Sequence, residues 1–222
     1  MNQEIERRRT FAIISHPDAG KTTLTEKLLL FGGQIQVAGA VKSNKIRKSA
    51  TSDWMEIEKE RGISVTSSVL QFNYEGYCIN ILDTPGHEEY TRNMAVGASF
   101  ADLAVILVDA KQGVLIQTKR HARICALMGI KHFVFAVNKM DLVGYSEERF
   151  NEINAQIAEL TKELSLADVV VIPVSATEGD NVTTKSENIP WYKGQALLPY
   201  LEQVDVDDTE EEKGFYMPVQ RV

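Results

Sequence analysis

Apolar runs that alternate with helical patterns constrain the fold of this chain more than any other feature. The runs contain no regular polar positions, and they occupy residues 10–15, 103–110, 131–139 and 168–176. Such runs are typical of strands that helices cover on both faces. Other segments repeat apolar residues at helical spacing, at 21–32, 116–129, 146–164 and 196–204. This order predicts an α/β fold with a wound, mainly parallel sheet.

A hairpin is predicted between the first two of these runs. Two β-rich stretches in residues 64–82 flank Glu75-Gly76, which is typical of a tight turn between paired strands. We therefore expect about six strands, five parallel and one antiparallel, with helices on both faces of the sheet. Residues 33–52 are polar and lack any period, which predicts a long loop of the kind that is usually functional or mobile.

The length of 222 residues allows one full α/β domain and the start of another. We expect the α/β domain to occupy residues 1–203. Residues 205–213 form an acidic run that predicts a solvated linker, and the strand-like residues 214–222 follow it. Residues 204–222 are therefore expected to hold this linker and the first strand of a second domain.

Composition argues against several classes of function. A formal net charge of −7 disfavours direct binding to DNA, and the basic cluster at 42–48 is typical of a solvated loop. No apolar run approaches the length that spans a bilayer, and the N-terminal apolar stretch is too short for a signal peptide. We expect a cytoplasmic protein without a membrane partner. Cys78 and Cys125 are then expected to be separate buried thiols.

Residues 15–23, SHPDAGKTT, nearly match the phosphate-binding loop G-x-x-x-x-G-K-[ST]. They lie between a predicted strand and a predicted helix, which is the context that the motif requires. Lys21 would neutralise the β- and γ-phosphates, and Thr22 would bind Mg²⁺. Ser15 replaces the first glycine, which is acceptable if this residue keeps a negative φ. The candidate nucleotide-binding residues of this loop are Ser15, His16, Pro17, Asp18, Ala19, Gly20, Lys21, Thr22 and Thr23.

Asp18 is unusual because it places a carboxylate within a loop that should bind phosphates. Its side chain either points away and braces the loop through backbone N–H groups, or holds a monovalent cation against the phosphates, since a bare carboxylate there would be repelled. Both interpretations stay open at this point.

Three further polar motifs follow predicted strands, at the edge of the sheet where open α/β folds bind ligands. They are DTPGH at 83–87, NKMD at 138–141 and SAT at 175–177. An aspartate at the end of a strand can bind Mg²⁺ through water, and a glycine N–H can reach the γ-phosphate. The candidate nucleotide-binding residues of these motifs are Asp83, Pro85, Gly86, Asn138, Lys139, Asp141, Ser175, Ala176 and Thr177.

The NKMD motif predicts the base. Asp141 can accept hydrogen bonds from the N1–H and the 2-amino group of guanine, and adenine would leave those carboxylate lone pairs unpaired. Asn138 would tie the base loop, residues 138–141, to the phosphate loop, residues 15–23. Lys139 would lay its aliphatic stem on the guanine ring. The backbone of Ser175-Ala176 would meet the guanine O6. The expected ligands are therefore GTP and GDP with Mg²⁺.

The ordered set of four motifs resembles the translational GTPase superfamily, which contains elongation factor Tu. The resemblance implies a P-loop NTPase G domain with a mixed six-stranded sheet and two switch segments that the γ-phosphate orders. It implies that Ser64 takes the place of the metal-binding threonine of switch I, so that the metal ligands are Thr22, Ser64 and Asp83. It also implies that His87 positions the attacking water, which would make Lys21 and His87 the catalytic residues.

Within that superfamily, different parts of the chain resemble different members. Residues 7–72 resemble the GTPase-type peptide-chain release factor, whereas residues from about 83 to 222 resemble the large GTPase subunit of bacterial ATP sulfurylase. In the latter resemblance the end of the chain corresponds to the start of a β-barrel domain. One hypothesis is a chimera joined within residues 73–83, and the other is an outlying member that only resembles a mosaic. The activating partner is accordingly either the ribosome or the catalytic subunit of ATP sulfurylase.

The sequence thus predicts a GTPase that hydrolyses GTP to GDP and phosphate slowly unless a partner accelerates it. Two other hypotheses remain. One is a nucleotide-binding module with little catalysis, in which the switch segments no longer cooperate. The other is an ATP-dependent kinase built on the same phosphate loop, which the NKMD motif disfavours.

Overall fold

A computed structural model describes residues 7–31, 68–74 and 76–206. The predicted loop at 33–52, Ser64 of switch I and most of the predicted linker and second-domain strand lie outside these residues. The strands are β1 (Arg8–Ser15), β2 (Ser68–Tyr74), β3 (Tyr77–Asp83), β4 (Leu103–Asp109), β5 (His132–Asn138) and β6 (Asp168–Pro173). The α-helices are α2 (Lys21–Phe31), α4 (Thr91–Ala98), α5 (Ile116–Leu127), α6 (Glu147–Leu164) and α7 (Leu197–Gln203).

The strands form one six-stranded sheet in the order β2-β3-β1-β4-β5-β6. Only β2 runs antiparallel, through its hairpin with β3, and the other four pairings are parallel. The predicted mixed sheet is therefore confirmed. Since β1 lies between β3 and β4, the chain leaves β1 toward one side of the sheet and later returns on the other. Parallel sheets of this kind bind ligands at the carboxyl ends of the strands beside such a reversal.

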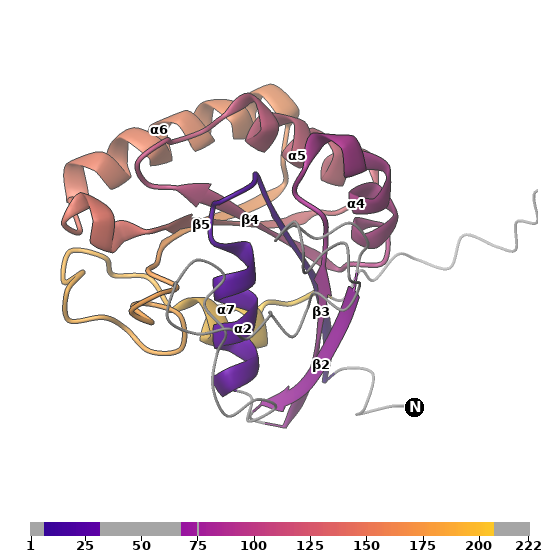
Figure 1. Cartoon of the computed structure of the whole chain (residues 1–222), viewed down its shortest axis with the longest axis horizontal. Helices are drawn as coiled ribbons and strands as arrows, with labels where there is room; N and C mark the ends of the chain where they lie inside the picture. The colour runs from indigo at the N-terminus through magenta and orange to yellow at the C-terminus, as the bar shows by residue number, and fades with distance from the viewer. Residues whose placement is uncertain (1–6, 32–67, 75, 207–222) are drawn as a thin grey trace, which may run out of the picture.

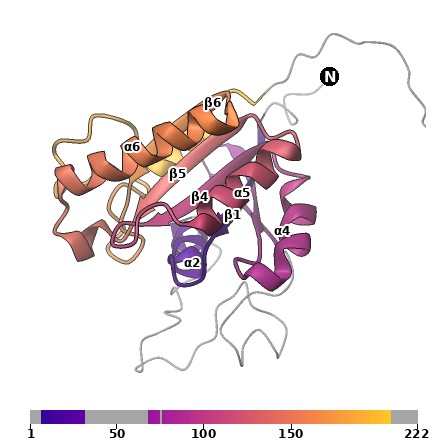
Figure 2. The same cartoon turned by 90° about the horizontal axis from the view of Figure 1, so that it is seen from above.

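Helices cover both faces of the sheet because its central strands are apolar on both sides. All seven residues of β4 are buried, and alternate residues enter different cores, since successive side chains of a strand point to opposite faces. One core packs against α4, α5 and α6, and the other against α2 and α7. Figures 1 and 2 show these two groups of helices on opposite sides of the sheet.

Helix α4 was not predicted from the sequence. It has only eight residues and buries Met94, Gly97 and Ala98, while Val96 is exposed. A single turn of buried side chains does not produce the repeated apolar spacing by which longer helices are recognised. Packing against β1, β3 and α5 therefore accounts for this helix better than local pattern does.

The prediction that both cysteines are buried is wrong for one of them. Cys125 is buried, and burial raises the pKa of its thiol to about 12. Cys78 is only half-buried, because it lies near the start of β3 beside the edge strand β2, where Gln71 Nε2 contacts its Sγ at 2.8 Å. Neither cysteine forms a disulfide.

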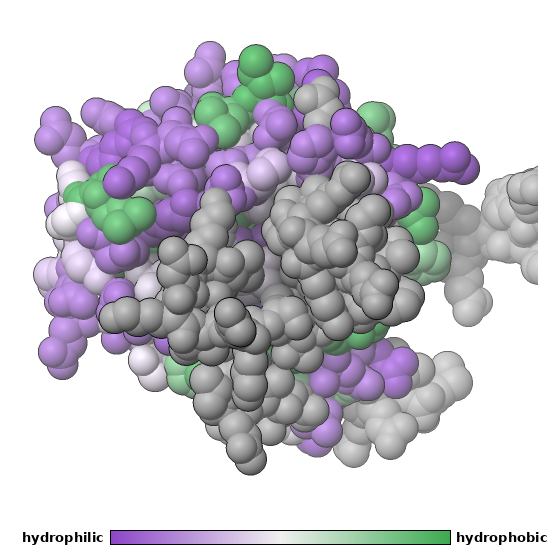
Figure 3. Space-filling view, in the orientation of Figure 1, coloured by the Kyte–Doolittle hydropathy of each residue, from purple (hydrophilic) through white to green (hydrophobic). Residues whose placement is uncertain are grey.

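Among the described residues visible in Figure 3 the surface is mainly hydrophilic, and hydrophobic residues form small separate patches. Among the described residues, no helix has both the length and the apolar character that crossing a membrane requires.

Candidate nucleotide-binding site

The loop after β1 adopts a backbone in which two positions need special residues. Gly20 has φ +94°, and a Cβ there would collide with the side chain of Asn138, so glycine is required for both conformation and space. Asp18 has φ 66°, a left-handed conformation that aspartate tolerates better than most residues. Ser15 is not among the residues with positive φ, so the condition for replacing the first glycine of the motif is met.

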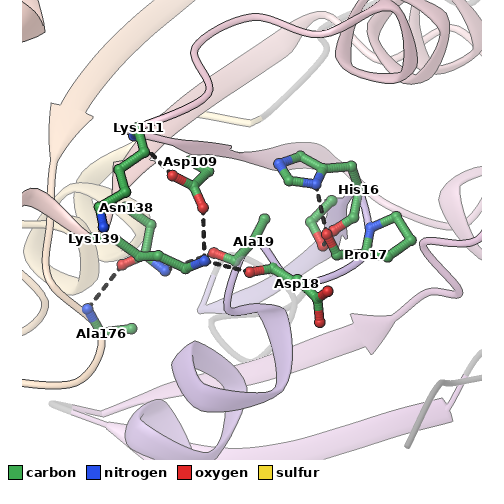
Figure 4. A network of polar contacts seen from close by, with 10 residues as sticks. His16, Pro17, Asp18, Ala19, Asp109, Lys111, Asn138, Lys139 and Ala176 are labelled. Atoms are coloured by element: carbon green, nitrogen blue, oxygen red, sulfur yellow. Dashed lines mark hydrogen bonds and ion pairs between the residues drawn. The ribbon is translucent and has the colours of Figure 1, made fainter. Parts of the chain in front are cut away.

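Asn138 joins three loops that are far apart in the sequence. It is buried at the end of β5, where its Nδ2 donates to the Ala19 carbonyl at 2.8 Å. Its Oδ1 accepts the backbone N–H of Ala176 at 2.9 Å. Figure 4 shows both contacts. The predicted tie between the base loop and the phosphate loop is present, and the N–H of Ala176 bonds to Asn138.

Lys139 extends across the phosphate loop from its own left-handed position, with φ 65°. Its Nζ donates to the carbonyl of Asp18 at 2.5 Å and to Asp109 Oδ2 at 2.6 Å. Figure 4 shows this ammonium between the two oxygens, with the Asp18 carboxylate on the far side of that residue. The carbonyl of Asp18, rather than its exposed carboxylate, therefore makes this contact.

Asp109 is a site residue that sequence reasoning missed. It is buried at the end of β4, and its Oδ1 accepts the backbone N–H of Lys111 at 2.8 Å. Burial alone raises the pKa of this carboxyl, but the hydrogen bonds from Lys139, Lys111 and Gln112 and the charge of Lys139 lower it more. Asp109 is thus held ionised. Its position at the end of a buried strand, like that of Asp83, was the signal that could have identified it.

Asp141 and Ser175 lie together on the base side of the site. The hydroxyl of Ser175 donates to Asp141 Oδ1 at 2.7 Å, and Ser175 itself is fully buried. Its hydroxyl oxygen in turn accepts the N–H of Glu178 at 3.3 Å. Thr177 meets α2 instead, since its carbonyl accepts from Lys27 Nζ at 3.2 Å. This hydrogen bond fixes the position of one oxygen of the Asp141 carboxylate, Oδ1.

Lys21 and Asp83 form a buried ion pair, with Nζ and Oδ1 2.5 Å apart. The second carboxylate oxygen of Asp83 is buried and has no hydrogen-bond partner within the described residues. Thr22 lies half-buried in the first turn of α2, beside Thr23. One carboxylate and one hydroxyl suit Mg²⁺, which usually binds one or two protein carboxylates together with substrate phosphates and water. These residues therefore fit the expected metal, although Ser64 lies outside the described residues.

The DTPGH turn rests directly on the phosphate loop. Thr84 Oγ1 donates to the carbonyl of Ile13 at 2.8 Å, and Pro85 after it is buried. A Cβ on Gly86 would collide with the carbonyl oxygen of Ser15, so close backbone approach requires glycine there.

His87 has only local contacts among the described residues. Its side chain is 40% exposed, its Nδ1 accepts the N–H of Glu89 at 3.3 Å, and its ring lies 6.0 Å from that of Tyr90. With Nδ1 as acceptor, the neutral ring carries its proton on Nε2.

Two histidines are buried near the phosphate loop: His16 belongs to the loop itself, and His121 lies on α5. His16 Nδ1 donates to the carbonyl of Pro17 at 2.6 Å, because a carbonyl can only accept. His121 on α5 is also buried, and its pKa is lowered to about 4 by burial, by the charge of His16 and by that of Arg120. Neither His16 Nε2 nor His121 Nδ1 has a hydrogen-bond partner in the described part of the chain.

The chain matches a known protein family over nearly its whole length. The sequence pattern of the elongation factor Tu GTP binding domain matches residues 6–211. The chain belongs to this family.

Two curated relatives are 44% and 48% identical to this chain over the part that aligns. Sulfate adenylyltransferase subunit 1 of Vibrio campbellii is 48% identical over 218 residues, which cover 92% of this chain and 46% of that protein. Bifunctional enzyme NodQ of Rhizobium meliloti is 44% identical and is covered to 34%. The structure of sup35 complexed with GMPPNP is similar with a TM-score of 0.65 and 28% identity, covering 94% of this chain and 49% of that one. The chain therefore spans about half or less of these relatives.

Within the described residues, the structure brings the predicted motifs of this GTP-binding domain to one rim. The phosphate loop contacts the base loops through Asn138 and Lys139, and it contacts the DTPGH turn through Gly86. His87 stands apart because no described contact fixes it to the phosphate loop.

Proposed function

We propose that this domain binds GTP and GDP together with Mg²⁺ and hydrolyses GTP slowly. The junction at Asn138 carries the proposal, because one buried side chain holds the phosphate loop, the base loop and the SAT loop in a single arrangement. Such an arrangement is what a ligand with a base at one end and phosphates at the other requires. Family membership supports the same conclusion.

Each residue of the rim has a role in this proposal. Asp141 accepts hydrogen bonds from guanine, and Lys21 neutralises the phosphates once a nucleotide competes with Asp83 for its ammonium. Thr22 and Asp83 would hold Mg²⁺, which when bound supplies positive charge against the phosphate oxygens. His87 would orient, through Nε2–H, a water that attacks the γ-phosphorus, and the Gly86 N–H would bind a γ-phosphate oxygen.

Hydrolysis is expected to be slow because His87 is exposed and has only local contacts. A partner that packs against the DTPGH turn would fix the ring and accelerate the reaction. Relatives named as subunit 1 of sulfate adenylyltransferase favour another subunit of such an enzyme as the partner, rather than the ribosome. The exposure of His87 also supports the second candidate, a nucleotide-binding module with little catalysis.

A relationship to the sulfate adenylyltransferase subunit along the whole domain is favoured over a chimera. A match that covers 92% of the chain must include most of the residues before position 73, which the chimera hypothesis assigns to a release factor. The release-factor resemblance of residues 7–72 stays a prediction. A monovalent cation near Asp18 also stays a proposal, supported by the exposure of that carboxylate beside the phosphate loop. Equal rates of GTP hydrolysis in potassium and in choline buffers would contradict the proposed cation.

The test is a fluorescence titration of the purified chain with GTP, GDP and ATP, followed by a single-turnover hydrolysis assay with Mg²⁺. We expect GTP and GDP to bind and ATP to fail as a competitor. Slow release of phosphate, which a partner subunit accelerates, would support the enzyme. Binding without phosphate release would leave the binding module, and a folded chain that ignores all three nucleotides would overturn the proposal.

A further inference from the structure

The segment after the SAT loop turns back onto the base loop and makes a contact that the expected site does not include. The backbone N–H of Ser175 donates to the carbonyl of Asp180 at 3.1 Å, as part of an isolated antiparallel bridge. The carboxylate of Asp180 in turn accepts the phenol O–H of Tyr145 at 2.6 Å. These contacts connect the SAT loop to the base loop by a second route, separate from Asn138.

Tyr145 is itself fixed to the base loop. Its backbone N–H donates to the carbonyl of Met140 at 2.8 Å, and its carbonyl accepts the indole N–H of Trp191 at 3.0 Å. Its φ of 55° is a left-handed conformation that a bulky residue rarely adopts. The backbone around Tyr145 is therefore determined by these contacts rather than by local preference.

Asp180 is held as firmly as Tyr145. Besides the tyrosine, its carboxylate accepts the hydroxyl of Ser186 at 2.6 Å and the side-chain amide of Asn188 at 3.2 Å. Hydrogen bonds to an ionised acceptor are stronger than neutral ones, and a network of several orients a carboxylate more firmly than any single contact.

These contacts close a ring that ends on the guanine-recognising carboxylate. Tyr145 holds Asp180, Asp180 holds Ser175, Ser175 donates to Asp141, and Asp141 follows Met140, to which Tyr145 returns. We propose that Tyr145 and Asp180 are positioning residues that set guanine specificity by fixing the orientation of the Asp141 carboxylate. The inference rests on the proposed guanine-nucleotide site, and it names the residues that tune its selectivity.

The reason lies in what guanine requires of a carboxylate. Guanine offers two donors, N1–H and the 2-amino group, so both oxygens of Asp141 must lie in the plane of the base. A small rotation of Asp141 weakens the hydrogen bond to the 2-amino group before it weakens the rest of the site. Inosine nucleotides lack that amino group. The affinity ratio between GDP and IDP therefore reports the orientation of Asp141 rather than general stability.

The first test is Tyr145→Phe, which removes one hydroxyl and keeps the ring. We expect IDP to bind the unaltered chain at least about tenfold more weakly than GDP, and the substitution to narrow this ratio by about threefold or more. Tyr200→Phe on α7 is the matched control, because Tyr200 is half-buried against the opposite core. It should leave the ratio unchanged, and circular dichroism should show both variants folded.

A double-mutant cycle with Ser175→Ala separates positioning from stability. If Tyr145 acts through Ser175, Tyr145→Phe should change the GDP/IDP ratio much less in the Ser175→Ala background. An unchanged ratio in Tyr145→Phe, or equal effects in both backgrounds, would overturn the inference while leaving the guanine-nucleotide site intact. Failure of the unaltered chain to bind GDP would overturn the proposed function instead, and this inference with it.

Discussion

The base side and the phosphate side of the rim are built differently. On the base side, Asn138 and Lys139 make polar contacts to residues 119 and 121 positions away in the sequence. On the phosphate side, His87 contacts only its near neighbours, and the buried Asp83 and His16 each retain a polar atom without a partner among the described residues. The fold itself completes the base side, and in the proposed function nucleotide, Mg²⁺ and a partner would complete the phosphate side. We therefore expect the fold alone to set the base specificity, whereas catalysis should also need a partner that fixes the phosphate side.

Asp141→Asn tests the base side and should have the largest effect. The amide NH₂ would face one of the two guanine donors, so that donor and the amide N–H would both lose their hydrogen bonds. We expect GDP affinity to fall about a hundredfold or more, and xanthosine diphosphate, which carries a carbonyl at C2, to gain affinity. Competition titrations with both nucleotides measure this. If GDP binding changes by less than about threefold, guanine does not bind at Asp141.

Because His121 is buried with a lowered pKa, we expect the protein to lose stability in acid. The pKa of His121 falls from 6.5 to about 4 on folding, so the unfolded chain binds the proton more tightly. The stability that is present above pH 6.5 is therefore lost as the pH falls toward 4, by about 2 kcal/mol at pH 5. His121→Gln should flatten the dependence of the unfolding free energy on pH in that window. If the unfolding free energy depends on pH in the same way in both proteins, His121 does not cause the loss of stability in acid.

His87→Ala tests the phosphate side. Because the ring has only local contacts, its contribution to unassisted hydrolysis should be about tenfold in rate, below the usual range of roughly a hundredfold or more for such residues. GDP and GTP affinities should stay within about twofold, since Lys21 and the base loops do not depend on it. Single-turnover hydrolysis and nucleotide titration separate the two effects. A variant that loses binding would show that His87 is structural.

The fold could be predicted because its strands are apolar on both faces and its longer helices repeat their apolar residues. Helix α6, with its regular buried face of Phe150, Ile153, Ile157 and Leu160, matched the predicted segment to within one residue at its start. Helix α4 was missed because it owes its place to packing against neighbouring elements. The described residues do not test the prediction that 204–222 begin a second domain.

The site could be predicted only where residues form local motifs. Gly20, Asn138 and Asp141 stand in recognisable spacings, and the structure brings their loops together. Asp109 and Asp180 belong to no such motif: a strand end marks Asp109 only as a candidate, and the roles of both depend on partners 30 and 35 residues distant in the sequence. Such pairings follow from strand order and loop return, which a short motif does not encode.

Asp109→Asn, which weakens the hold of Lys139 on the phosphate loop, should have the smallest effect of these substitutions. The substitution keeps the shape of the side chain but removes its charge, so the ion pair with Lys139 is lost and at most a weaker hydrogen bond from the ammonium to a neutral amide oxygen remains. Lys139 would then hold the Asp18 carbonyl less firmly, and GDP should dissociate about three to five times faster. Asp168→Asn is the matched control, because Asp168 pairs with His132 at the opposite ends of the strands. If GDP leaves both variants at the same rate, the contact of Lys139 with Asp109 is structural only, and the base side is held by Asn138 without it.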